Sequence, residues 1–149
     1  MTTLDEVAEL AGRERFLAVV STVRADGSVQ SSVVNAGVLR HPLRDGAQVE
    51  QVVGFVTYGK AKLANLRARP QITVTFRWGW AWAAVEGRAE LIGPDDPVAG
   101  TDEERLRLLL REVFRAAGGS HDDWDAYDRE MAEQRRTVVL IAPGRIYSN

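Results

Sequence analysis

Residues 16–29 read FLAVVSTVRADGSV, and the fold follows from this stretch. Phe16 to Val23 is apolar and rich in β-branched residues, which is typical of a buried strand. Ala25-Asp26-Gly27-Ser28 then turns the chain, and Asp-Gly is a strong hairpin signal. Val29 to Leu39 is expected to return as a second strand, antiparallel to the first.

Other elements are predicted on both sides of this hairpin. Before it, Thr3-Leu4-Asp5-Glu6 is a capping box that predicts a short helix ending near Gly12. After it, the pattern predicts an exposed loop over 40–51 and strands over 52–58, 71–77 and 80–92. Helices are predicted over 60–69, over 101–118 beginning with a capping box, and from 120 onward. A last strand is predicted over 137–141, and it resumes at 145–147.

These elements predict the fold class. About six strands in mostly antiparallel hairpins, with short helices between and after them, indicate an α+β fold built as a small antiparallel barrel with peripheral helices. The irregular order of helices and strands disfavours a doubly wound parallel sheet. A length of 149 residues with 45% hydrophobic residues fits a single domain over 1–149.

Several kinds of chemistry have little support in this sequence. The chain has no cysteine, so disulfides, thiolate metal sites and a cysteine nucleophile are excluded. His41 and His121 lie far apart, and no paired-His, Walker A or Gly-x-Ser-x-Gly motif occurs, so we expect no metal site and can name no catalytic residue. A chain without its own reactive side chain is expected to borrow its chemistry from a cofactor.

Charge and hydropathy limit the partners. The net charge of −2 gives no reason to expect nucleic-acid binding. The N-terminus is polar and acidic, and no apolar run is long enough to span a membrane. We therefore expect a cytoplasmic protein that has no membrane partner.

The two lysines of the chain, Lys60 and Lys62, stand together in a sequence that otherwise uses arginine. They fall in Gly59-Lys60-Ala61-Lys62, where a buried strand is expected to end and a helix to begin. Helix N-termini present free N–H groups and bind anions readily. The segment therefore indicates an anionic ligand, and the alternative is a pair of solvated surface lysines.

Aromatic and polar side chains offer further candidates. Trp78, Trp80 and Trp82 are predicted to alternate on one face of the long hairpin, where large amphipathic rings suit a planar ligand or a dimer interface, or else the barrel core. Gln30, Ser31 and Ser32 place amide and hydroxyl groups on the second strand. These groups could face a polar ring edge or simply the solvent.

Six pieces of the chain together carry a resemblance. They are Ser21-Thr22-Val23 with Asp26-Gly27, residues 59–67 (GKAKLANLR), residues 85–91 (VEGRAEL), residues 124–127 (WDAY), Arg135-Arg136 and Arg145-Ile146-Tyr147. In this order and spacing the chain resembles the flavin- and deazaflavin-binding split β-barrel proteins, which are similar in fold to pyridoxamine 5′-phosphate oxidase. More closely, it resembles the actinobacterial deazaflavin-dependent reductases of that superfamily.

The resemblance implies a homodimer with two cofactor sites shared across the interface. It assigns the binding of the cofactor phosphate to Lys60, Ala61, Lys62 and Asn65. It places Thr57 and Tyr58 beside the ring or ribityl chain, and Gln30 and Ser32 at the ring edge. Trp80 and Trp82 would shape the pocket. The loop over 40–51 is longer and more charged than the family suggests, so it could cover the substrate side.

The resemblance also implies a function. The first hypothesis is a reductase in which the deazaflavin coenzyme F-420 donates hydride to a small unsaturated or quinone-like acceptor. The alternatives are an FMN-dependent enzyme of the pyridoxamine-phosphate-oxidase type, or a binding protein that holds a cofactor or tetrapyrrole without turnover. Haem would need an axial ligand from His41 or His121, and neither belongs to the predicted site.

Overall fold

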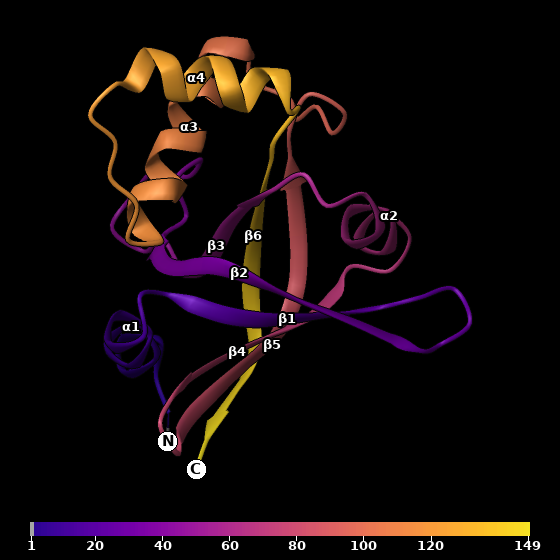
Figure 1. Cartoon of the computed structure of the whole chain (residues 1–149), viewed down its shortest axis with the longest axis vertical. Helices are drawn as coiled ribbons and strands as arrows, with labels where there is room; N and C mark the ends of the chain where they lie inside the picture. Colours follow the sequence, from indigo (N-terminus) through magenta and orange to yellow (C-terminus); the bar gives the residue numbers. More distant parts are fainter. Residues whose placement is uncertain (1) are drawn as a thin grey trace.

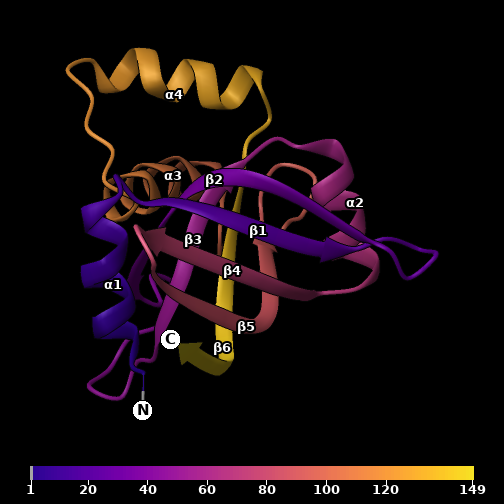
Figure 2. The same cartoon turned by 60° about the horizontal axis from the view of Figure 1, so that its bottom comes forward.

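The computed structural model describes residues 2–149. In chain order the elements are α1 (Leu4–Arg13), β1 (Leu17–Val23), β2 (Val29–Arg40), β3 (Gln51–Thr57), α2 (Lys60–Ala68), β4 (Gln71–Trp78), β5 (Ala81–Ile92), α3 (Glu103–Ala116), α4 (Trp124–Glu133) and β6 (Thr137–Ser148). Figures 1 and 2 show the strands crossing one another around a common core, with α3 and α4 gathered on one side.

The strands form a closed barrel in the order β1-β2-β3-β6-β5-β4. Every pairing is antiparallel, and the predicted first hairpin forms with Val20 opposite Ser32 and Val23 opposite Val29. The ring closes where β4 meets β1, with Val20 opposite Val74, and β3 pairs with β6 from the far end of the chain, with Val53 opposite Ile141. This architecture confirms the predicted α+β barrel with peripheral helices.

The barrel interior is filled by side chains that alternate along the strands. Phe55, Phe76, Val74 and Val85 are completely buried in it. Helix α1 closes one end of the barrel by packing Leu4, Val7 and Ala11 into the same cluster. Its start is the one predicted, since the Thr3 hydroxyl accepts the Glu6 N–H.

Helix α3 covers the outer face of β2 and β3, so β3 is buried on both sides. This explains the nearly continuous apolar run of β3, because a strand covered on both faces needs no polar alternation. A Cβ placed on Gly37 of β2 would lie only 2.0 Å from the Ala116 carbonyl oxygen. Glycine at this position therefore allows the end of α3 to approach the barrel.

Helix α4 is held against α3 by polar contacts. The Tyr127 hydroxyl donates to the Leu110 carbonyl at 2.9 Å. The Asp128 carboxylate accepts from Arg107 at 2.8 Å and also pairs with Arg111. The two helices and their connections fill the chain between β5 and β6.

Some predicted boundaries were wrong by a few residues. Asp102 and Asp123 cap α3 and α4, in place of Thr101 and Ser120, because an Asp carboxylate accepts the free N–H three residues on. Strand β6 runs without a break, and the interruption expected at Pro143-Gly144 is a register shift opposite Glu86 and Gly87.

The loop between β2 and β3 is exposed over residues 44–48, as predicted, but its first residue is not. His41 is only 4% exposed. Its Nδ1 accepts the Leu43 N–H, so Nε2 carries the proton and donates to Glu90 at 2.8 Å. The buried imidazole therefore ties the start of this loop to β5.

Two general observations concern residues 2–149. No helix in this range is long and apolar enough to cross a membrane. The same range contains no group of three or more His, Asp or Glu side chains that could hold a metal ion.

Candidate functional site

The segment that joins β3 to α2 forms the centre of the candidate site. Gly59 is the N-cap of α2 and offers no side chain to the free N–H groups of the first turn, and that turn contains no acidic residue. The Thr57 hydroxyl accepts the Gly59 N–H at 3.2 Å and fixes the turn. Helix α2 thus begins with N–H groups that an anion can take up.

Lys62 turns inward from this helix. Its side chain is buried, with 7% exposed. The ammonium donates to Thr57 Oγ1 at 3.4 Å and lies 5.8 Å from the centre of the Phe55 ring. Burial lowers the pKa of Lys62, and the positive charge of Arg136 lowers it further. A cation held in this way is stabilised by an anion at the same place.

Arg136 lies between α4 and β6 and reaches the same region. Its guanidinium stands 3.9 Å from the centre of the Tyr58 ring, a cation–π contact, and its Nε donates to Gln134. Burial lowers the pKa of Arg136, although Tyr58 and the carboxylate of Glu130 act in the opposite direction. The ion pairs found among residues 2–149 include neither Lys62 nor Arg136.

A cleft of about 590 Å³ opens beside these two cations. This volume is in the range of small-molecule binding sites. Its polar end is formed by the β3–α2 turn with Lys62 and Arg136, and its apolar walls come from β2, α3 and α4. The apolar lining includes Val34, Val56, Phe114, Tyr127 and Met131.

Three residues with unusual backbone angles flank the cleft. Arg15, Phe16 and Arg135 have positive φ values of 57°, 61° and 51°. Arg15 lines the cleft and Arg135 directly precedes Arg136. Non-glycine residues in this region of backbone space are strained and are often found at binding sites.

Some of the predicted cofactor residues meet at Asn65, one turn after Lys62 on α2. The Asn65 amide donates to Thr22 at 3.1 Å and to Gln30 at 3.4 Å. Because side chains alternate along a strand, Gln30, Ser32 and Val34 share one face of β2. This face leads from Asn65 to the cleft. Lys60 and Ala61, by contrast, are exposed on the first turn of α2.

The tryptophans lie elsewhere. They were predicted to share one face of the hairpin, and this prediction was wrong. Trp80 is in the turn between β4 and β5 and is 94% exposed. Trp78 pairs with Ala81, whereas Trp82 pairs with Arg77 and contacts the ring of Tyr147. The two-residue turn Gly79-Trp80 places Trp78 and Trp82 on opposite faces of the hairpin.

The tryptophans are also far from α2 within one chain. The end of β5 near α2 is marked by Arg88, which pairs with Gln71. Trp82 is six residues from Arg88 in β5, which at about 3.3 Å per residue separates them by about 20 Å. Figure 1 shows the tip of the β4–β5 hairpin near the chain termini, well away from α2.

The sequence prediction of the site missed Arg136 and the apolar wall of α3 and α4. Arg136 was noticed only as part of the Arg135-Arg136 pair, and nothing in the sequence places it beside Lys62. His41 and His121, considered as haem ligands, do not line the cleft. Both ring nitrogens of His41 are already hydrogen-bonded, to Leu43 and Glu90.

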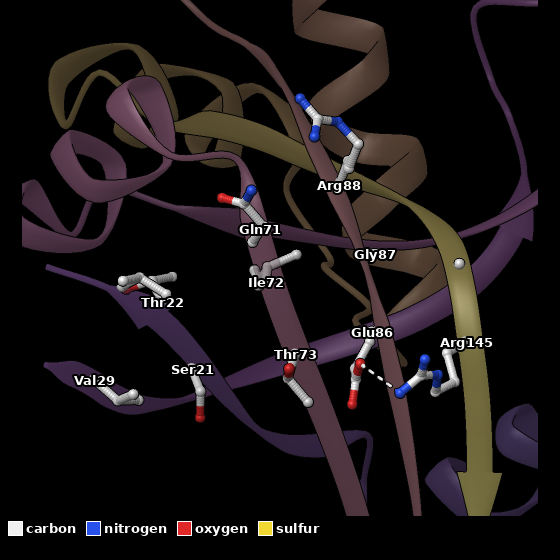
Figure 3. Close-up of a pocket in the computed structure, with 12 residues that line it drawn as sticks. Ser21, Thr22, Val29, Gln71, Ile72, Thr73, Glu86, Gly87, Arg88 and Arg145 are labelled. Atoms are coloured by element: carbon white, nitrogen blue, oxygen red, sulfur yellow. Dashed lines mark ion pairs between the residues drawn. The ribbon is translucent and has the colours of Figure 1, made fainter. Parts of the chain in front are cut away.

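A second hollow, of about 400 Å³, lies on the outer face of β1, β4, β5 and β6 (Figure 3). Ser21, Thr73 and Glu86 line it, and Glu86 pairs with Arg145 at 4.0 Å. The same outer face continues along β1 and β2 through Val19, which is 42% exposed, and Val33, which is 64% exposed.

Comparisons with known proteins agree with this architecture. A family model described as pyridoxamine 5′-phosphate oxidase matches residues 4–149. Among solved structures, a conserved hypothetical protein of Mycobacterium tuberculosis has a TM-score of 0.67 at 19% sequence identity, over 99% of this chain and 84% of that chain.

Two further structures are similar to this chain. A pyridoxamine 5′-phosphate oxidase-related, FMN-binding protein of Nostoc punctiforme has a TM-score of 0.63 at 12% identity, over 97% of this chain and 82% of that chain. An F-420 reductase has a TM-score of 0.57 at 17% identity, over 89% of this chain and 90% of that chain. At these identities the likeness shows that the fold is the same.

Proposed function

Because the chain belongs to the pyridoxamine 5′-phosphate oxidase family, we propose that it binds a flavin-type cofactor at the β3–α2 turn and uses it as a hydride carrier. The proposed cofactor is the deazaflavin coenzyme F-420, and the proposed acceptor is a small unsaturated or quinone-like molecule. In this proposal the chain is one of the deazaflavin-dependent reductases of the family. The fold likeness to an F-420 reductase supports the proposal.

The observation that carries the proposal is the environment of Lys62. Its ammonium is buried beside the N-terminus of α2, and no carboxylate among the described residues pairs with it. A cation is costly to bury unless an anion compensates it. A cofactor phosphate is the compensating group that the proposal requires, so the residues present fit the cofactor.

The other predicted residues have definite parts in this proposal. Lys60, Lys62 and the N–H groups of the α2 first turn at Ala61 would bind the phosphate. Asn65 would join them by releasing one of its two amide contacts, to Thr22 or to Gln30. Gln30 and Ser32 of β2 would offer an amide and a hydroxyl to the polar edge of the cofactor ring, and Thr57 and Tyr58 would flank the ring or ribityl chain.

The chemistry divides between cofactor and protein. When bound, a reduced deazaflavin would supply a hydride to the acceptor, and one proton from solvent or a side chain would complete the two-electron reduction. The protein orients the acceptor over the cofactor ring, and the apolar walls from α3 and α4 keep water away from the transfer. Tyr58 and Arg136 stand at the polar end of this space.

With Trp80 and Trp82 in the site, the proposal requires a second copy of the chain. Trp80 and Trp82 cannot reach the α2 turn of their own chain, as the length of β5 requires. The outer face of β1 and β2 exposes Val19, Val29 and Val33, with 59% of Val29 exposed. We propose that this face binds its equivalent in a homodimer, so that the β4–β5 hairpin of each chain reaches the site of the other.

An FMN-dependent enzyme is the second candidate. The same cations can bind the phosphate of FMN, and the Nostoc punctiforme protein of the same fold is described as FMN-binding. The cleft volume of about 590 Å³ does not distinguish the two cofactors. The distinction therefore requires a binding measurement.

A titration of tryptophan fluorescence with oxidised coenzyme F-420, and separately with FMN, tests the proposal. Saturable quenching at micromolar concentration by F-420 is expected, because a ring near Trp80 or Trp82 quenches their emission. Quenching by FMN alone would move the assignment to the FMN-dependent enzyme. Quenching by neither would rule out the proposed function. Arg129→Gln, a substitution on the exposed side of α4 that should leave the quenching unchanged, is titrated beside the native protein as a control.

A further inference from the structure

Arg136 resembles Lys62 in having no ion-pair partner among residues 2–149; Lys62 is buried and Arg136 is half-buried. The neighbouring Arg135 is different: it is exposed and pairs with Asp95 at 2.6 Å. Two adjacent arginines thus have opposite environments. Arg135 is paired with a carboxylate at the surface, whereas the unpaired guanidinium of Arg136 lines the cleft.

The position of Arg136 is fixed by its surroundings. The Tyr58 ring lies against the guanidinium on one side, and the Gln134 side chain accepts from Nε. The strained turn at Arg135 brings the chain from α4 to β6 at this point. The two Nη groups have no hydrogen-bond partner among the described residues, so a ligand can take them up.

Lys62 faces the same space from α2. Its Nζ would lie 3.6 Å from a Cβ placed on Gly59, so the ammonium stands close to the helix N-terminus. A larger residue at 59 would occupy the space next to this ammonium. The ammonium, the guanidinium and the free N–H groups of α2 therefore converge on one end of the cleft.

We propose that Lys62 and Arg136 together bind one oxyanion, a phosphate or a carboxylate, of an organic ligand whose apolar rings lie in the cleft against Phe114, Tyr127 and Met131. Arg136 is then a binding residue that the lysine motif does not contain. The inference rests on the proposed function. It adds that recognition of the anion depends on the chain that follows α4 as well as on the α2 turn.

The oxyanion can belong to the cofactor or to the acceptor, and two titrations separate these sources. The first compares FMN with riboflavin, and F-420 with its phosphate-free deazaflavin core, because each pair differs by the phosphate-bearing part. The second uses cofactor-loaded protein and compares 2-naphthoate with neutral 2-acetylnaphthalene. Each titration is made with the native protein, Arg136→Gln and Arg135→Gln, after circular dichroism confirms that the variants fold.

If the anion is the cofactor phosphate, Arg136→Gln weakens FMN or F-420 binding by about tenfold or more and leaves the phosphate-free compounds unchanged. If the anion belongs to the acceptor, the variant loses the preference for 2-naphthoate instead. Arg136→Lys should restore part of the affinity, because it keeps the charge but not the paired N–H groups.

The inference is overturned if Arg136→Gln and Arg135→Gln behave alike in both titrations. This failure differs from failure of the proposed function. A native protein that binds F-420 or FMN without dependence on Arg136 keeps the function and loses the inference. A native protein that binds neither cofactor loses the function, and the second titration is then made on the protein without cofactor: a preference for 2-naphthoate that depends on Arg136 keeps the anion site.

Discussion

At the level of single residues, Lys62 stands where its charge weakens the fold in the absence of a ligand. Burial and Arg136 lower its pKa from the ordinary value of 10.5. Between the lowered pKa and 10.5 the unfolded chain holds more protons than the folded one, so stability rises as pH rises through this window. Below the window, the charged side chain costs the folded state free energy.

The first prediction concerns the substitution Lys62→Met. It should raise the free energy of unfolding at pH 7 by about 0.5–2 kcal/mol, because an apolar side chain of similar length needs no counter-ion. The gain should shrink as the pH approaches 10.5. Thermal denaturation from pH 7 to pH 10 measures both effects.

The control for this prediction is Lys60→Met, because Lys60 is exposed on the same helix turn and should leave the stability unchanged. The same Lys62 variant should lose cofactor binding. Higher stability together with lost binding would show that the ammonium serves the ligand and not the fold. A less stable Lys62→Met protein at pH 7 would show that the ammonium is already compensated within the chain.

At the level of elements, the sequence was sufficient for strands and helices whose signals are local. The Asp-Gly turn, the Thr3 cap and the apolar run of β3 each predicted an element that the structure contains. The break at Gly79 was predicted, but Trp80 was assigned to the following strand, whereas it belongs to the two-residue turn. This two-residue turn has a large effect on the site, since it puts Trp78 and Trp82 on different faces of the hairpin.

The packing of α3 on β2 leads to a second prediction at this scale. Gly37→Ala should lower the free energy of unfolding by about 1–3 kcal/mol, because the new Cβ would lie 2.0 Å from the Ala116 carbonyl oxygen and force the helix outward. Ala117 and Gly118 follow directly and line the cleft, so ligand affinity should fall as well. Chemical denaturation and a cofactor titration measure the two effects.

Gly12→Ala provides the comparison for Gly37→Ala. The nearest atom to a Cβ on Gly12 is a Phe16 ring carbon at 3.8 Å, an ordinary contact, and the residue is helical. Alanine should therefore be neutral or slightly stabilising there. If Gly37→Ala were equally well tolerated, α3 would have to be able to shift away from β2 at little cost.

At the level of the whole molecule, the barrel was predictable and its closure was not. Hairpins such as β1–β2 join neighbours in sequence, whereas the pairing of Val53 with Ile141 joins strands separated by three helices. The site follows the same rule. Lys62 and Asn65 were found because they are close in sequence, but Arg136 meets Lys62 only through the closed fold.

The last prediction tests whether the proposed site is shared between two chains. A homodimer should migrate at twice the 16.5 kDa of the chain in analytical ultracentrifugation. Lys62→Met and Trp82→Ala should each abolish or weaken cofactor binding, although these residues are about 20 Å or more apart in one chain. Coexpression of the two variants should restore native affinity in about a quarter of the sites, because about half of the dimers are mixed and each holds one site with both native residues.

Lys62→Met coexpressed with Arg136→Gln supplies the matched negative control. Where the anion bound by Lys62 and Arg136 is the cofactor phosphate, both substitutions weaken cofactor binding in the part of the site that a single chain contributes, so every site in a mixed dimer carries one of them and no native affinity should return. Restoration in the first pair and not in the second requires that Trp82 come from the other chain. If neither pair recovers, Trp82 acts within its own chain or only through the fold, and the exposed face of β1 and β2 must have a different occupant.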